Sequence, residues 1–420
     1  MLSALFIVSA SLVAAQTLET QIVNVASPQE LSPALQAAQS SEQPVTLRLA
    51  RGDYPPFTLT NIVNPLRIEA LDPQTPPHLL GLKVQDSTNL SFANLIFDFR
   101  FDPTTSELWS SVFRFENSNH LSFDQVLVDG ALMTGTGTDG DDYPAGRGLH
   151  FARTQNVTIT DSEVRGLWVG LSVTESRNFT LRRNYLHGVR KDILTLAQVQ
   201  DVEIDGNYFG AFNRSFAFDD HPDMIQMWTA RTSDPSERVN IRNNVFNSGH
   251  GPWSQTIFFR NELVDRGDAG SNMFYRDVAI DNNLIINSHI HGIFVGETRR
   301  LSITNNTLVR NFRSEEDGMS DALAAPQIRI AEQNQEVMIA RNVAAGLPQS
   351  PIATNWVIHD NVVIQSTAIV RNGHYRDVFV DALSGDPEDL RSYQFNPDGP
   401  LHNQNIGANL ATLPRIRERP

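Results

Sequence analysis

Cysteine is absent from this chain of 420 residues, and lysine occurs only at Lys83 and Lys191. The absence of cysteine excludes a disulfide framework, so the folded state must rest on core packing and hydrogen bonds. The net charge of −15 disfavours nucleic acid and anionic membranes as general partners. After residue 15, no apolar stretch is long enough to cross a bilayer, so we expect no membrane insertion.

The chain begins with a short apolar run that ends in small residues, M-L-S-A-L-F-I-V-S-A-S-L-V-A-A. It lacks an early Lys or Arg, but its composition and the placement of Val13 and Ala15 are typical of a signal peptide. We therefore expect residues 1–15 to be a signal peptide and the protein to be secreted or periplasmic. Within one domain, we expect a strand and a short amphipathic helix over residues 16–44, the main fold over 45–380, and an irregular tail over 381–420.

The most abundant feature is a nine-residue pattern, as in R-V-N-I-R-N-N-V-F at Arg238. Its fourth residue is apolar, and the closest copies are about 19 to 23 residues apart, the length of one coil of a parallel β-solenoid. Alternation within each copy predicts a strand with one buried face. Asn tolerates a left-handed backbone, so the recurring Asn predicts a tight turn and a side-chain ladder between coils. The fourth residues are Phe92, Phe123, Ile159, Leu181, Ile204, Ile241, Ile280, Ile303, Ile339 and Ile358, and the recurring Asn residues are Asn184, Asn207, Asn244, Asn283, Asn306, Asn342 and Asn361.

A second series of strands lies between the copies, as in G-L-W-V at Gly166, D-M-I-Q-M at Asp223 and Q-T-I-F-F at Gln255. Together the two series resemble the right-handed parallel β-helix of the pectate-lyase-like superfamily, from Val45 to Val370. The resemblance implies an all-β solenoid of about ten or more coils whose N-terminal end is covered by a short helix. The segment S-P-Q-E-L-S-P-A-L-Q-A-A-Q, residues 27–39, fits that helix.

The densest group of reactive side chains is A-F-D-D-H-P-D-M-I-Q-M-W-T, residues 217–229. If Ile225 and Met227 point inward, Gln226 and Trp228 face solvent, where Trp could bind a sugar ring. One coil earlier, R-K-D-I-L-T-L places Asp192 about 4.8 Å from Asp223 along the stack. Two carboxylates this close share a proton or hold a cation. A straight strand would point both into the core, and they face outward only if the chain bends at the strand start.

The following coils bring further candidates into the same region, and from all of them we expect a catalytic group, a substrate-binding group and a metal-binding group. The catalytic candidates are His221, His250, Lys191 and Arg260. The substrate-binding candidates are Gln226, Trp228, Trp253, Arg329 and His291. The resemblance to pectate lyases further implies Ca²⁺ on Asp192, Asp220 and Asp223, and we expect no organic cofactor.

Three functions fit this arrangement. The first is a lyase or C5-epimerase of an acidic polysaccharide, in which Lys191 or Arg260 neutralises a uronate carboxylate and His221 or His250 removes the neighbouring proton. The second is a glycoside hydrolase, because acids, Gly249-His250-Gly251 and Gln327–Ile330 come in an order similar to polygalacturonases. Inversion needs carboxyl groups about 6.5–9.5 Å apart, however, which favours the first function. The third is a non-catalytic carbohydrate-binding solenoid, in which polar residues would be spread over more coils.

Overall fold

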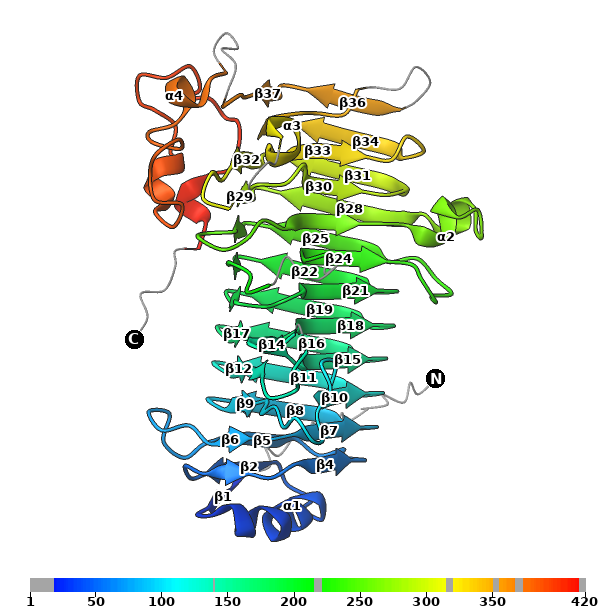
Figure 1. Cartoon of the computed structure of the whole chain (residues 1–420). Coiled ribbons are helices and arrows are strands. Elements are labelled where there is room, and N and C mark those ends of the chain that lie inside the picture. The colour runs from blue at the N-terminus through cyan, green and yellow to red at the C-terminus, as the bar shows by residue number, and fades with distance from the viewer. Residues whose placement is uncertain are drawn as a thin grey trace, which may run out of the picture.

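The protein folds into one elongated stack of strands, in which almost every strand pairs in parallel with strands of the neighbouring coils (Figure 1). The computed structural model describes residues 19–138, 140–214, 221–314, 320–349, 355–366 and 373–414. The predicted signal peptide, residues 1–15, and the predicted metal ligand Asp220 lie outside the described residues. Among the described helices, none has the length and apolar composition that crossing a membrane requires.

Three parallel sheets form the sides of the stack. The thirteen-stranded sheet contains β1 (Gln21–Val25), β2 (Val45–Leu49), β5 (Leu66–Ala70), β8 (Thr88–Ala93), β11 (Asn119–Asp124), β16 (Gln155–Thr160), β19 (Arg177–Arg182), β22 (Gln200–Asp205), β25 (Glu237–Arg242), β28 (Tyr275–Asp281), β31 (Thr298–Thr304), β34 (Gln335–Ala340) and β36 (Trp356–His359). The ten-stranded sheet contains β4 (Phe57–Thr60), β7 (Leu82–Gln85), β10 (Ser111–Glu116), β15 (Arg147–Ala152), β18 (Val169–Thr174), β21 (Asp192–Ala197), β24 (Asp223–Trp228), β27 (Gln255–Phe259), β30 (His291–Val295) and β33 (Gln327–Ile330). The twelve-stranded sheet contains β3 (Asp53–Tyr54), β6 (His78–Leu79), β9 (Ile96–Asp98), β12 (Leu127–Asp129), β17 (Glu163–Arg165), β20 (Tyr185–His187), β23 (Tyr208–Phe209), β26 (Val245–Asn247), β29 (Leu284–Asn287), β32 (Thr307–Arg310), β35 (Val343–Ala344) and β37 (Val362–Val363).

The nine-residue pattern supplies two of the three sides. Its first part forms a strand of the thirteen-stranded sheet and its last apolar pair begins a strand of the twelve-stranded sheet, as β25 and β26 show. The second predicted series forms the ten-stranded sheet. The fourth residues of the copies are buried in the core, with the exception of Ile358 in the last copy, which is half-buried. A solenoid of ten or more coils is therefore confirmed.

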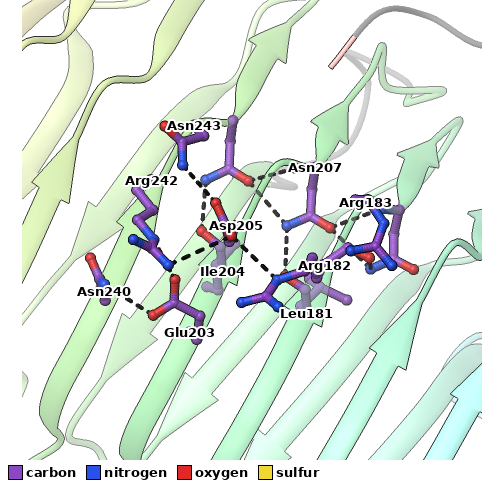
Figure 2. Close-up of polar contacts among 12 residues, drawn as sticks. Leu181, Arg182, Arg183, Glu203, Ile204, Asp205, Asn207, Asn240, Arg242 and Asn243 are labelled. Carbon is purple, nitrogen blue, oxygen red and sulfur yellow. Dashed lines mark hydrogen bonds and ion pairs between the residues drawn. The ribbon is translucent and has the colours of Figure 1, made fainter. Parts of the chain in front are cut away.

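The recurring Asn residues form the expected ladder at the turn between these two strands. The Asn207 side chain donates to the Leu181 carbonyl oxygen at 2.8 Å (Figure 2). It also donates to Asn244 Oδ1 at 3.0 Å. Asn244 repeats both contacts one coil later, with Ile204 and Asn283. Buried amide groups are stable only when they are hydrogen-bonded, and each Asn of the ladder supplies a hydrogen-bond partner to the Asn of the neighbouring coil.

The sequence predicts a left-handed backbone at the recurring Asn itself, and this prediction is wrong. The ladder residue Asn244 has no positive φ, whereas Asn243 immediately before it has φ 56°. The first residue of every copy from Asn89 to Glu336 is also left-handed, including Arg238 at 54° and Glu336 at 56°. The ladder Asn is selected for its buried amide, while the left-handed conformation falls on neighbouring residues that are often Asn, Asp or Arg.

Segments outside the coils cover one end and one side of the stack. The predicted helix is present as a 3₁₀ turn (Pro28–Glu30) followed by α1 (Leu31–Gln39), and α1 lies across the N-terminal end (Figure 1). Residues 373–414 pack their apolar side chains on the outer face of the twelve-stranded sheet, where Tyr375 and Phe379 join a cluster with Val245 and Leu284. The remaining short elements are β13 (Ala131–Met133), β14 (Tyr143–Ala145), α2 (Glu262–Asp265), α3 (Asp321–Ala324), α4 (Tyr375–Val378) and the 3₁₀ turns Ser271–Met273, Leu390–Tyr393 and Leu410–Thr412.

Candidate functional site

The outer face of the ten-stranded sheet carries one continuous row of side chains, because the strands stack in register. We call this set the outer row. Along the stack, its side chains change from basic residues to hydroxyl and amide groups and then to aromatic rings, and the row ends in an arginine. In chain order the outer row is Lys83, Arg114, His150, Ser172, Thr195, Gln226, Phe258, Phe294 and Arg329.

A group of two cations and an indole lies at the beginning of strands β15, β18 and β21. The Arg147 guanidinium carbon is 4.7 Å from the centroid of the Trp168 ring, and Lys191 Nζ is 5.5 Å from the same ring. These distances are typical of cation–π contacts. Lys191 is half-buried, so part of the residue remains accessible to solvent. Arg190, by contrast, is fully buried, and its guanidinium carbon lies 5.9 Å from the ring of Tyr143 in the antiparallel pair of β13 and β14. It cannot reach a ligand on this face.

Asp192 and Asp223 lie one coil apart, as predicted, but both are buried. Asp192 is 3% exposed and Asp223 is 0% exposed, and the Asp223 amide donates to Asp192 Oδ1 at 3.3 Å. Neither carboxylate oxygen of Asp223 has a hydrogen-bond partner in the described part of the chain. Burial, together with the nearby Asp192 carboxylate, raises the pKa of Asp223 well above its usual value, and Lys191 opposes this shift. The Asp223 carboxyl group therefore favours its protonated form more strongly than an exposed aspartate does.

The described residues do not by themselves form a calcium site. Calcium takes six to eight oxygen ligands, and Asp192 and Asp223 supply only part of that number. No group of three or more Asp, Glu or His residues suited to a metal is found among the described residues, and Asp220 is not one of them. Calcium binding therefore stays a prediction, and no step proposed below depends on it.

The predicted catalytic residues are divided among three places. His221 is exposed and lies two residues before Asp223, near the Lys191 end of the strands. His250 is 61% exposed, and its Nε2 lies 3.3 Å from Asp386 Oδ1 in the C-terminal segment. Arg260 follows the last residue of β27 and pairs with Asp265 at 2.8 Å. The structure thus brings Lys191 and His221 together at the start of two neighbouring strands, β21 and β24, but it does not bring His250 or Arg260 there.

Several predicted substrate-binding residues meet around His291. Trp253 stacks on His289 with ring centroids 4.9 Å apart, and His289 contacts His291 at 5.0 Å. His291 Nδ1 lies 2.7 Å from Gln255 Oε1, and Arg329 Nη1 lies 3.5 Å from His291 Nε2. Burial lowers the pKa of His289 to about 3 and that of His291 to about 4. Both imidazoles are therefore neutral at neutral pH. Gln226 and Trp228 are half-buried on β24, two coils before the strand that contains His291.

Comparison with known proteins identifies the architecture. The family profile described as "Right handed beta helix region" matches residues 147–320. The solved structure of the Dettilon tailspike protein is 13% identical, with a TM-score of 0.54, and the match covers 81% of this chain and 67% of that one. This chain is a right-handed parallel β-helix. The match to pectate lyase Pel9A has 13% identity and a TM-score of 0.47, covering 95% of this chain and 97% of that one. The match to PfbA, a surface adhesin of Streptococcus pneumoniae, has 12% identity and a TM-score of 0.45, covering 80% and 89%. No curated protein matches the sequence.

The sequence interpretation of this β-helix missed four residues of the face: Arg147, Trp168, Phe258 and Phe294. Phe258 and Phe294 are half-exposed, whereas their strand neighbours Ile257 and Ile293 are 0% exposed. The alternation in Q-T-I-F-F and G-I-F-V contains that signal. Four of the five tryptophans of the chain lie on strands of this sheet or on the segments that lead into them: Trp109, Trp168, Trp228 and Trp253.

Proposed function

We propose that this protein is a carbohydrate-active enzyme that binds an acidic polysaccharide along the outer face of the ten-stranded sheet. We further propose that it acts at a uronate residue by β-elimination or C5-epimerisation. The observation that carries the proposal is the position of Lys191, half-exposed between the Trp168 ring and the buried carboxylic acids. The apolar start of the chain supports a secreted or periplasmic location for this activity.

Both reactions begin with loss of the proton on the carbon next to the uronate carboxylate. That carbon becomes acidic only when the carboxylate charge is neutralised, because the negative charge of the intermediate spreads onto the carboxylate oxygens. Lys191 and Arg147 supply two positive charges at one place on the face. The nearby imidazole of His221 is exposed and can accept the proton. In elimination the neighbouring C4–O bond then breaks, whereas in epimerisation a proton returns from the opposite side of the ring.

The buried acids support the cations rather than contact the sugar. Asp223 has no exposed surface, so it can act only through its neighbours. The Asp192 carboxylate favours the charged form of Arg147, whose pKa is otherwise lowered by burial. The Asp192 carboxylate thus acts on both neighbours: it raises the pKa of the buried Asp223 and it attracts the Arg147 guanidinium at the strand ends.

A glycoside hydrolase is the second candidate, because a carboxyl group with a raised pKa, such as Asp223, is the kind of group that serves as a general acid. Two observations weigh against it. Strands on adjacent coils are about 4.8 Å apart, less than the separation of about 6.5–9.5 Å that inversion needs. Asp223 is also 0% exposed. We therefore place the lyase or epimerase first.

The test uses the full chain with polygalacturonate and with alginate. A lyase produces an unsaturated uronide whose absorbance near 235 nm rises with time, and an epimerase incorporates deuterium at C5 from heavy water. We expect one of these signals from the wild-type protein and its loss in Lys191→Gln. The control is Arg299→Gln, which removes an exposed cation from β31 on another sheet. New reducing ends without either signal would indicate a hydrolase, and no product from either polymer would indicate a binding protein.

A further inference from the structure

Three rings form a compact cluster on the outer face of β27 and β30. The cluster lies between the proposed reaction centre, which consists of Arg147, Lys191 and His221, and the C-terminal end of the sheet. Phe258 stacks on His291 with centroids 5.2 Å apart and on Phe294 at 4.9 Å, and His291 and Phe294 are 5.3 Å apart. All three rings are half-buried, unlike the core residues beside them. A ring cluster that keeps a solvent-facing side is suited to the apolar face of a sugar ring.

Arg329 lies at the edge of this cluster and is exposed. A guanidinium has only donors, so the contact of Arg329 Nη1 with His291 Nε2 at 3.5 Å requires Nε2 to be the acceptor. His291 Nδ1 must then carry the proton and donate to Gln255 Oε1 at 2.7 Å. The low pKa of His291, caused by burial and by Arg329, agrees with this neutral tautomer. The contact with His291 uses one N–H group of the guanidinium, and the exposed remainder faces solvent.

We propose that Phe258, His291, Phe294 and Arg329 form a distal subsite that binds a uronate residue of the same polysaccharide chain. The rings would contact the face of the sugar and Arg329 its carboxylate, which a guanidinium can bind through two parallel hydrogen bonds. This inference rests on the function proposed above. It adds that the protein binds a second carboxylate of the polymer, at a fixed distance from the carboxylate that Lys191 neutralises.

The register of the strands gives that distance. Thr195, Gln226, Phe258, Phe294 and Arg329 are successive partners on five neighbouring strands. Arg329 therefore lies four strands from Thr195, or roughly 19 Å along the stack at 4.8 Å per strand. Lys191 precedes Thr195 by four residues, so its separation from Arg329 is larger than this value. A short oligosaccharide cannot cover both places. We therefore expect the distal subsite to matter only for longer chains.

The experiment compares a uronate trisaccharide, the octasaccharide and the octasaccharide with its carboxyl groups reduced to alcohols, all from the polymer that the wild-type protein binds. Titration calorimetry on full-length variants should show that Arg329→Gln weakens octasaccharide binding about tenfold, as expected for a lost charge-assisted contact. The same variant should leave the trisaccharide and the reduced octasaccharide unchanged. Phe258→Leu keeps apolar volume but removes the ring, and should weaken both octasaccharides about threefold. Arg299→Gln is the matched control and should change none of the three.

Each outcome decides between the two proposals. Unchanged octasaccharide affinity in Arg329→Gln, or an equal loss for the reduced form, would overturn the distal subsite even if the wild-type protein turns over substrate. Octasaccharide binding that depends on Arg329, without 235 nm absorbance or deuterium uptake, would support the subsite and overturn the proposed reaction. If the wild-type protein binds neither polygalacturonate nor alginate oligosaccharides, both proposals fail.

Discussion

At the scale of single residues, His221 offers the sharpest test of the reaction centre. Its ring is exposed, so replacing it removes little packing. We expect His221→Ala to lower kcat by at least about a hundredfold, the usual effect of losing a general base. The melting temperature should remain nearly unchanged, because exposed substitutions cost about 0.5 kcal/mol or less. Steady-state kinetics and calorimetry on the same preparation measure both quantities.

The matched control for this variant is His402→Ala, an exposed histidine in the C-terminal segment. It should change neither kcat nor the melting temperature. A kcat for His221→Ala within threefold of the wild-type value would remove His221 from the mechanism. A large fall in melting temperature would instead indicate that the residue stabilises the loop and strand around it.

Because the buried imidazoles beside Trp253 have lowered pKa values, we expect the free energy of unfolding to fall in mild acid. Burial lowers the pKa of His289 to about 3, and the His291 amide donates to its Nδ1 at 3.1 Å, a contact that protonation would break. Because the folded pKa lies below the unfolded value of about 6.5, the unfolded chain binds protons that the folded chain does not. The stabilisation is therefore complete above pH 6.5 and is lost as the pH falls toward 3.

Urea unfolding at pH 7 and pH 4.5 measures this effect. We expect the wild-type free energy of unfolding to fall by on the order of 1–3 kcal/mol more than that of His289→Asn. Asn keeps an acceptor for the His291 amide but does not titrate in this range. Equal pH dependence in the two proteins would show that His289 is not the group responsible.

At the scale of elements, the Asn ladder makes each coil depend on its neighbours. Asn244→Ala would remove the donor to the Ile204 carbonyl and the acceptor for the Asn207 amide, leaving both buried and unsatisfied. Each such group costs about 1–3 kcal/mol. We expect a total loss of about 3 kcal/mol in the free energy of unfolding, measured by chemical denaturation.

Asn240→Ala serves as the control for the ladder. Asn240 is on β25, just before the turn that contains Asn244, but its side chain is on the outer face and donates to Glu203 at 2.9 Å (Figure 2). Losing one half-exposed contact should cost less than about 1 kcal/mol. Similar losses from Asn240→Ala and Asn244→Ala would contradict the claim that the ladder, rather than any Asn of the same pattern copy, holds the coils together.

The elements were predictable because their signals are local. Alternation within a strand and the spacing of one coil are properties of neighbouring residues, and they located the strands of the thirteen-stranded and ten-stranded sheets. The strands of the twelve-stranded sheet were not predicted, because only a short apolar pair marks them in the sequence. The same alternation indicated that Asp192 and Asp223 point inward on a straight strand, and both are buried. The site was less predictable because it depends on contacts between distant segments. The contact of His250 with Asp386, for example, comes from the packing of the C-terminal segment.

At the scale of the whole molecule, the C-terminal segment is an integral part of the fold. Phe379 is 1% exposed and packs against Tyr375 and Phe395, with centroids 5.6 and 5.9 Å away. Its neighbour Val380 is 54% exposed. We expect Phe379→Ala to lower the free energy of unfolding by about 3–5 kcal/mol, the usual cost of removing a buried phenylalanine.

Val380→Ala is the control and should cost less than about 0.5 kcal/mol. Thermal unfolding with a dye that binds exposed apolar surface would follow both variants. If Phe379→Ala unfolds at the wild-type temperature, the segment does not contribute to the stability of the coils. Early dye binding in Phe379→Ala alone would show that the outer face of the twelve-stranded sheet has become exposed.

The uneven distribution of tryptophan gives the protein an optical property. Trp109, Trp168, Trp228 and Trp253 accompany the ten-stranded sheet, whereas Trp356 begins β36 on the thirteen-stranded sheet and donates to the Asn334 carbonyl at 2.8 Å. A molecule that settles on the ten-stranded sheet changes the surroundings of the first group and leaves Trp356 as an internal reference. Intrinsic emission is therefore a label-free signal of occupancy for that side of the coil, whatever chemistry follows.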